Sequence, residues 1–337
     1  MKVSEFEYKL PDAAIAQTAV EPRHSSRLLD TRDLSDHTFI DLPQLLSPGD
    51  LIVVNDTRVR SARLVGHRLD TGGKVELLLL DKTEKGLWEA LARPSRRLRP
   101  GVEIEIGALV ARIESEPDDG LVLVSLQSDD EDRAIEASGS IPLPPYFNGE
   151  LASPDRYQTM YAETPGSAAA PTAGLHFTDQ VIAGLRHRDV RIATVDLHVS
   201  LDTFRPMSVG DIDDHLMHSE WCRIPEGTAA EIERTRDGGG AIVAVGTTVV
   251  RTLESMSNDS GTVSAGECRT DLFLKPGSPI RVVDTLITNF HMPRSTLLVL
   301  LAAFMGDSWR TAYRTALSRG YRFLSFGDAM LAVRHRS

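Results

Sequence analysis

Histidine and carboxylate side chains gather in one short polar segment of this 337-residue chain, residues 213–220 (DDHLMHSE). The segment contains Asp214, His215, His218 and Glu220. Imidazole titrates near neutral pH and a neighbouring carboxylate tunes it, so this group is suited to general acid–base catalysis. A zinc site is the weaker interpretation, because zinc needs three or four ligands at a recognisable spacing and H-E-x-x-H is absent. A solvated helix start is the third interpretation.

Two further histidines lie in turns. His176 belongs to the irregular octet APTAGLHF (170–177), which has no acidic residue, lysine or arginine. His291 follows the end of an expected strand in LITNFHMPRSTLL (286–298), just before an apolar helix. A single histidine in such a turn is more often structural than catalytic, so neither segment identifies a site by itself.

Polar residues also follow the ends of two expected strands. VVNDTRV (53–59) places Asn55 and Asp56 after a run of valines, and AIVAVGTTVVRTLES (241–255) opens a helix just after Gly246. Ligands in open α/β sheets gather at the carboxyl ends of strands, and a free helix start suits a phosphate or a carboxylate. The alternatives are an Asx-stabilised turn and an ordinary threonine-capped helix. Neither segment matches a P-loop or a dinucleotide-binding fingerprint.

The densest positive charge lies in RPSRRLRPG (93–101), which contains Arg93, Arg96, Arg97 and Arg99. Such a loop is either a surface for phosphate contacts or a solvated hairpin loop. The net charge of −11 argues against a protein that coats nucleic acid non-specifically, because that affinity comes from clustered lysine and arginine. It does not exclude a local basic patch.

The surrounding elements predict an α/β fold. Residues 61–127 contain six short β-rich runs broken by turns, which favours a small antiparallel β-barrel. Strands alternate with helices after about residue 165, including a helix over 178–189 with Thr178 at its N-cap and a buried helix over 297–305. We therefore expect a larger α/β barrel-like body, residues 1–60 and 140–337, with the barrel inserted as residues 61–139.

The composition is that of a globular protein, with 41% hydrophobic and 25% charged residues. Cys222 and Cys268 form no C-x-x-C pattern, which favours two reduced thiols over a disulfide or a thiolate metal site. The first twelve residues have no apolar signal region, and the longest apolar run is too short to span a bilayer. We expect a cytoplasmic protein with no membrane partner.

Nine motifs in this order closely resemble the S-adenosylmethionine:tRNA ribosyltransferase-isomerase family of the queuosine pathway. The resemblance covers nearly the whole chain, so a chance match is very improbable. The motifs are VVNDTRV, PLPPY, RYQTMYA, AAAPTAGLHF, LHV…TFRP, DHLMHSE, VAVGTTVVRTLES, LITNFHMPRSTLL and YRFLSFGDAM.

The resemblance implies an α/β body with an inserted small β-barrel, and it implies an activity. The family transfers the ribosyl group of S-adenosylmethionine to the aminomethyl group of 7-aminomethyl-7-deazaguanine at the tRNA wobble position. The ribose is isomerised to an epoxycyclopentanediol, which gives epoxyqueuosine and releases adenine and methionine. S-adenosylmethionine is the co-substrate, so we expect no cofactor and no metal, and we expect a monomer whose partner is the modified tRNA.

This chemistry needs a general base for a ribose proton beside the sulfonium and a general acid for the departing adenine. The resemblance points to His176, Asp214, His215, His218 and His291 for proton transfer. It points to Asn55, Asp56, Arg58, Thr172, Gly174, Glu220, Thr247, Thr248, Arg251 and Asn289 for substrate contacts. The four arginines of residues 93–101 are the candidates for contact with tRNA.

The chain departs from the family pattern at two places. HVSLDTF has Ser200 and Asp202 where the family usually has glycine, and Arg60-Ser61 follows NDTRV where a more apolar pair is common. Glycine permits close approach of the backbone to a ligand, so these changes raise the question of which acceptor receives the ribosyl group. The alternatives are a related enzyme that acts on a free 7-deazapurine or another small amine, and a non-catalytic RNA-binding relative.

Overall fold

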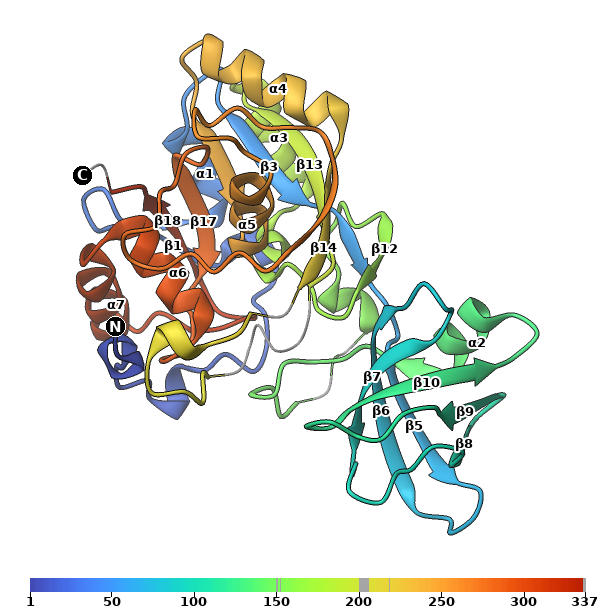
Figure 1. Ribbon diagram of the computed structural model, residues 1–337. Coiled ribbons are helices and arrows are strands. Elements are labelled where there is room, and N and C mark those ends of the chain that lie inside the picture. Colours follow the sequence, from blue (N-terminus) through green and yellow to red (C-terminus); the bar gives the residue numbers. More distant parts are fainter. Residues whose placement is uncertain (150, 152, 200–205, 218, 336–337) are drawn as a thin grey trace. The chain divides into compact units, whose positions relative to one another are not determined.

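The computed structural model describes residues 1–149, 151, 153–199, 206–217 and 219–335 (Figure 1). The chain forms two compact units, which we call the body and the barrel unit. The body comprises Met1–Thr57, Pro144–Thr164 and Ala170–Ser337, and the barrel unit comprises Arg58–Leu143 and Pro165–Ala169. The borders predicted from the sequence, 60/61 and 139/140, lie three and four residues from the borders at 57/58 and 143/144.

The body contains a nine-stranded mixed sheet in the order β16-β14-β13-β3-β15-β17-β18-β1-β2. Its centre is parallel, because β3 pairs in parallel with both β13 and β15, and β15 pairs in parallel with β17. The strands are β1 (Arg27–Asp30), β2 (Ser35–Thr38), β3 (Leu51–Asn55), β13 (Arg191–Leu197), β14 (Glu220–Ile224), β15 (Ile242–Val245), β16 (Gly266–Thr270), β17 (Thr285–Asn289) and β18 (Ala329–Val333).

Helices cover both faces of this sheet. Alternate residues of β3 point to opposite faces, so Leu51 and Val53 join one buried cluster while Ile52 and Val54 join the other. The first cluster is completed by α4 (Glu226–Asp237), α5 (Thr247–Ser255), α6 (Thr296–Met305) and α7 (Ser308–Ser318), and the second by α1 (Leu42–Leu45) and α3 (Asp179–His187). Burial on both faces explains why β3 and β15 are continuous apolar runs.

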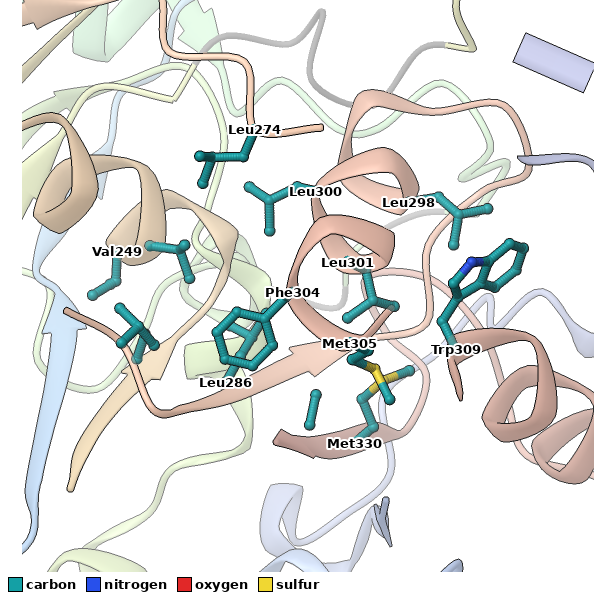
Figure 2. Packing of buried hydrophobic residues seen from close by; sticks show 14 of the residues in the cluster. Val249, Leu274, Leu286, Leu298, Leu300, Leu301, Phe304, Met305, Trp309 and Met330 are labelled. Atoms are coloured by element: carbon teal, nitrogen blue, oxygen red, sulfur yellow. The ribbon is translucent and has the colours of Figure 1, made fainter. Parts of the chain in front are cut away.

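Helix α6 confirms the buried helix predicted over 297–305. The Ser295 hydroxyl accepts the N–H of Leu298 at 3.2 Å, and Gly306 ends the helix with a φ of +61°. Figure 2 shows Leu298, Leu301 and Phe304 packed among side chains from neighbouring elements. The apolar character of almost every position follows from this surrounding contact.

Helix α3 begins at the predicted place but is capped differently from the prediction. Thr178 occupies the N-cap position, yet its hydroxyl makes no hydrogen bond to the first turn of the helix. The hydroxyl lies 2.7 Å from Nδ1 of His24 instead. A tertiary contact has replaced the local cap.

The barrel unit contains the predicted six-stranded antiparallel barrel. The strand order is β5-β6-β7-β10-β9-β8, and β8 pairs with β5 to close the barrel. Gly66 sits at the closure, where an added Cβ would lie 2.2 Å from the Glu105 carbonyl oxygen. The strands are β5 (Arg63–Arg68), β6 (Lys74–Lys82), β7 (Trp88–Arg93), β8 (Glu103–Ile106), β9 (Leu109–Ile113) and β10 (Leu121–Gln127).

Short elements complete the barrel unit and its connections. Helix α2 (Glu131–Ser138) forms in the acidic segment and is followed by β11 (Gly139–Ser140), which pairs with β5. Strands β4 (Thr57–Val59) and β12 (Thr164–Ser167) pair with each other. The α/β fold with an inserted small antiparallel barrel is therefore confirmed. No helix in the described part of the chain has the length and apolar character that crossing a membrane requires.

Candidate active site

A pocket lies in the body at the carboxyl ends of β15 and β17. This is the edge of a parallel sheet at which ligands bind, because loops and helix N-termini meet there. The lining residues are Tyr146, Ala170, Pro171, Thr172, Ala173, Val199, Gly246, Thr247, Thr248, Thr288, Asn289, Phe290, His291, Met292, Ser295, Leu297, Leu324 and Ser325.

The wall of the pocket carries hydroxyl, amide and apolar groups. Among the residues that the structure describes, the lining set contains no aspartate, glutamate, lysine or arginine. Tyr146 and His291 are its titratable members. Burial raises the pKa of Tyr146 to about 12, and its hydroxyl lies 2.5 Å from the Ser325 hydroxyl. The phenol is therefore neutral, and the imidazole of His291 is the basic group in this wall.

His291 lies two residues beyond the end of β17 and is fixed by three hydrogen bonds. Its Nε2 lies 3.0 Å from the Thr288 hydroxyl, its N–H donates to the Tyr313 hydroxyl at 2.8 Å, and its carbonyl accepts from the Tyr8 hydroxyl at 2.5 Å. Burial lowers the pKa of His291 to about 3. The ring is therefore neutral at pH 7, the form that accepts a proton.

His176 contacts the pocket through Asn289 and does not line it. The Asn289 amide donates to Nε2 of His176 at 3.2 Å, and its oxygen accepts from the Thr172 hydroxyl at 2.9 Å. Because Nε2 accepts, Nδ1 carries the proton and donates to the Ser26 hydroxyl at 2.7 Å. Burial, aided by two arginines, lowers the pKa of His176 to about 4. The imidazole orients the Asn289 amide at the pocket wall.

Local structure explains how the octet 170–177 reaches this position. A 3₁₀ helix over Thr172–His176 follows Pro171, and Phe39 stacks on the His176 ring with 5.0 Å between centroids. A Cβ added at Gly174 would lie 2.1 Å from the Tyr161 hydroxyl, so this position requires glycine for space. The octet is therefore a packed wall of the body, with Thr172 facing the pocket.

The start of α5 forms another part of the wall. Gly246 has a φ of +89°, a conformation that favours glycine, and this turns the chain from β15 directly into the helix. Thr247 and Thr248 follow in the first turn and line the pocket. In the described structure the helix has no side-chain cap, and the buried Thr248 hydroxyl oxygen has no hydrogen-bond partner.

Two buried carboxyl groups meet at the adjacent ends of β3 and β13. Burial and the neighbouring Asp196 carboxyl raise the pKa of Asp56 to about 7. One oxygen of each group has no hydrogen-bond donor among the described residues, as expected where two carboxyl groups face each other. Asp56 was predicted from its motif and Asp196 was not, although Asp196 is an acidic residue inside the buried run RIATVDLHV.

The Asn55 side chain, next to the two carboxyl groups, makes hydrogen bonds that hold the backbone together. Its side-chain oxygen accepts the N–H of Thr57 and of Leu197, both at 3.2 Å, and its amide donates to the Leu197 carbonyl at 3.0 Å. The amide thus forms the Asx turn considered above and joins the ends of β3 and β13. Neither Asn55 nor Asp56 is among the residues that line the described pocket.

The comparisons with known proteins agree with this architecture. The sequence profile of a family described as "Queuosine biosynthesis protein" matches residues 3–332. The chain belongs to this family. A Moorella thermoacetica protein and an Anaeromyxobacter dehalogenans protein, both named S-adenosylmethionine:tRNA ribosyltransferase-isomerase, are each 48% identical to it, over 342 and 346 residues. Each alignment covers 99% of this chain and 100% of the relative.

A solved structure supports the same family. The crystal structure of an S-adenosylmethionine tRNA ribosyltransferase from Thermotoga maritima matches 97% of this chain and 99% of its own, with a TM-score of 0.55 and 37% identity. The resemblance drawn from nine ordered motifs is thus confirmed for the queuosine biosynthesis family.

The described residues of the segment 213–220, which are 213–217, 219 and 220, do not line the pocket. Asp214 is exposed, and the His215 ring contacts Phe273 edge-on with 5.6 Å between centroids. His218 lies outside the described residues, as do Ser200 and Asp202 of the departing motif. No group of three or more histidine, cysteine or acidic side chains in the described chain is arranged to hold a metal ion.

Arg251 and Glu220 form a buried ion pair between α5 and β14. The guanidinium also donates to the Leu272 and Thr270 carbonyls at 3.1 and 3.3 Å. Neither residue lines the described pocket, so the structure uses both charges to hold the sheet edge. The other predicted contact, Arg58, is exposed on β4.

The basic loop of residues 93–101 joins β7 to β8 in the barrel unit. Leu98 is buried and fixes the loop to the barrel, while Arg93, Arg96, Arg97 and Arg99 are exposed. Arg99 lies 3.5 Å from Glu116 in an exposed ion pair. A shallow groove beside this loop is lined by Arg93, Arg96, Arg99, Glu116 and Asp119, among others. The loop thus presents four guanidinium groups to solvent.

Proposed function

We propose that this chain transfers and isomerises the ribosyl group of S-adenosylmethionine onto 7-aminomethyl-7-deazaguanine at the tRNA wobble position. Full-length membership of the queuosine biosynthesis family supports this proposal, since relatives that are 48% identical are named S-adenosylmethionine:tRNA ribosyltransferase-isomerase. The products are epoxyqueuosine in tRNA, adenine and methionine. S-adenosylmethionine is the co-substrate, and the reaction uses no other cofactor.

The uncharged pocket beside His291 is the observation that carries the proposal. A sulfonium acidifies the ribose proton beside it, and a neutral imidazole is the protonation state that removes such a proton. Burial keeps His291 in that state at pH 7. We assign His291 as the general base and His176 as a positioning residue that holds the Asn289 amide at the pocket wall.

Activity on tRNA is tested directly with the full chain. The protein is incubated with S-adenosylmethionine and tRNA that carries 7-aminomethyl-7-deazaguanine, and adenine release and tRNA mass are measured. We expect adenine and a tRNA mass gain in equal amounts. Adenine release that depends on a free 7-deazapurine, with no change in tRNA mass, would establish the small-acceptor alternative. No adenine with any acceptor would leave the RNA-binding alternative.

We assign the exposed arginine loop of the barrel unit to tRNA phosphate contact. Changing Arg96 and Arg97 to alanine removes two exposed cations, so tRNA affinity and its dependence on salt should both fall. The matched control replaces Arg112 and Arg133, two exposed arginines elsewhere on the barrel unit. Filter binding at several salt concentrations measures both pairs, and equal effects of the two pairs would remove the loop from the interface.

A further inference from the structure

The Thr248 hydroxyl is a buried polar group that the fold leaves without a partner. The side chain is 7% exposed, and in the described structure no atom forms a hydrogen bond with its oxygen. The hydroxyl turns back toward the start of α5, because a Cβ built on Gly246 would lie 3.5 Å from it. Thr248 also lines the pocket. Buried hydroxyls are ordinarily hydrogen-bonded, so this one is expected to meet a ligand.

The same turn supplies backbone donors. An α-helix leaves its first N–H groups without intrahelical acceptors, and the first intrahelical acceptor of α5 is the Gly246 carbonyl, which receives the N–H of Val250 at 3.5 Å. The Gly246 N–H donates to the Ile287 carbonyl at 2.8 Å and is therefore in use. The N–H groups of Thr247 and Thr248 remain at the positive end of the helix dipole beside the pocket. This arrangement suits a negatively charged group.

The rest of the wall offers an anion no other positive partner. No lysine or arginine is present among the lining residues that the structure describes. Arg251, one turn further along α5, is occupied by Glu220 and by backbone carbonyls. An anionic group in this pocket therefore has its favourable position at the first turn of α5.

We propose that the first turn of α5, with the Thr248 hydroxyl, binds the α-carboxylate of the methionine portion of S-adenosylmethionine. This assignment rests on the proposed function and names the part of the substrate that the helix start holds. The carboxylate accepts hydrogen bonds from the backbone and from Thr248. Its negative charge is thereby matched without a cationic side chain near the sulfonium.

A backbone phosphate of RNA is the other source of an anion. The lining is uncharged and contains six apolar side chains beyond alanine and proline, namely Val199, Phe290, Met292, Leu297, Leu324 and the ring of Tyr146. Phosphate surfaces in proteins are instead exposed and basic. The pocket chemistry thus favours the carboxylate of a small zwitterion.

The test compares two probes by isothermal titration, S-adenosylmethionine and its decarboxylated analogue, on wild-type protein and three variants. Thr248→Val removes the hydroxyl and keeps the shape. The matched control is Thr252→Val on the same helix, whose hydroxyl donates to the Thr248 carbonyl at 3.0 Å and is fully buried. Thermal unfolding of each variant, together with Thr248→Ser, separates loss of the hydroxyl from loss of the fold.

We expect wild-type protein to bind S-adenosylmethionine more tightly than the decarboxylated analogue. Thr248→Val should lower the affinity for S-adenosylmethionine about tenfold, since a hydrogen bond to a charged group is lost. The affinity for the decarboxylated analogue should not change. Thr248→Ser should bind S-adenosylmethionine with wild-type affinity, because it keeps the hydroxyl. Thr252→Val should bind both probes with wild-type affinity.

Equal affinity of wild-type protein for the two probes would overturn the carboxylate assignment, as would equal losses for both in Thr248→Val. Weaker binding of tRNA alone by Thr248→Val would assign the turn to an RNA phosphate and overturn it too. The proposed function is tested separately, by measuring the gain in tRNA mass. Turnover without carboxylate discrimination refutes only this inference, and discrimination without turnover refutes only the proposed function.

Discussion

Replacing Asp56 by asparagine tests the buried carboxyl pair at the ends of β3 and β13. The pKa of Asp56 is raised to about 7 from its ordinary value of 3.8, first by burial and then by Asp196. The folded protein therefore keeps a proton that the unfolded chain releases above pH 4. Stability is unaffected below pH 3.8 and falls as pH rises toward 7, because the unfolded state binds fewer protons.

The size of this effect follows from the linkage relation. A full proton difference changes the free energy of unfolding by about 1.4 kcal/mol per pH unit, so the interval from pH 5 to pH 7 corresponds to about 3 kcal/mol. Asp196 also lies 4.0 Å from the exposed Arg223, and Glu163 adds a like charge near Asp56. Solvent near this carboxyl pair screens the repulsion between the two charges. We therefore expect the free energy of unfolding to fall by about 2 kcal/mol over this interval.

Asparagine has the shape of a protonated aspartate and cannot ionise. The free energy of unfolding of Asp56→Asn should therefore rise relative to that of wild type by about 2 kcal/mol between pH 5 and pH 8. Urea unfolding at both pH values measures the difference. Asp196→Asn should behave in the same way, because either substitution removes the like-charge contact.

Asp50→Asn is the matched control, since the Asp50 carboxylate is buried but accepts the backbone N–H groups of Ser47 and Ala241 at 2.9 and 2.8 Å. It should lower stability at both pH values. The reasoning on the pair is refuted if wild type and Asp56→Asn keep a constant difference in unfolding free energy from pH 5 to pH 8.

Three further substitutions test the site and its support. Gly174→Ala should lower the free energy of unfolding by about 1–3 kcal/mol, because the new methyl collides with the Tyr161 hydroxyl, and adding Tyr161→Phe should recover part of the loss in thermal melts. Glu220→Gln leaves the Arg251 charge unpaired in the interior, so the free energy of unfolding measured with urea should fall by about 3–5 kcal/mol. A fall of less than about 1 kcal/mol would mean that the pair is solvated. Asn289→Leu removes the amide that hydrogen-bonds Thr172 and His176 at the pocket wall, so both kcat and S-adenosylmethionine affinity should fall, and unchanged values in kinetics and titration would remove this amide from the site.

Hydrophobic patterning was sufficient to predict most elements of this fold. The barrel strands alternate because one face of each is buried, and α6 and β3 are apolar throughout because neighbours surround them. Local pattern was less informative where a tertiary contact decides the outcome. The Thr178 hydroxyl bonds His24, which lies 154 residues away in sequence, instead of capping its own helix.

The site was predictable where a motif ends a strand. Asn289, Thr247 and Thr248 line the pocket because β15 and β17 are neighbours and both stop at this edge of the sheet. Charged residues within the same motifs were harder to assign. Arg251 is buried in an ion pair with Glu220, which lies 31 residues earlier in the sequence. Local sequence patterns do not show such a pair, because it forms only when distant strands and helices pack together.

The position of the barrel unit within the sequence has a consequence for synthesis on the ribosome. Strand β3 is made early, yet its neighbours in the sheet are residues such as Ala193 and Ala244, which follow the whole barrel sequence. Every pairing within the six-stranded barrel joins residues from 63 to 127. Since domains fold as units in the order of their synthesis, the nascent chain can complete the barrel while the apolar strand LIVVN still lacks both partners. We therefore expect the folding yield of this enzyme to depend on chaperones that cover this strand until its partners are made.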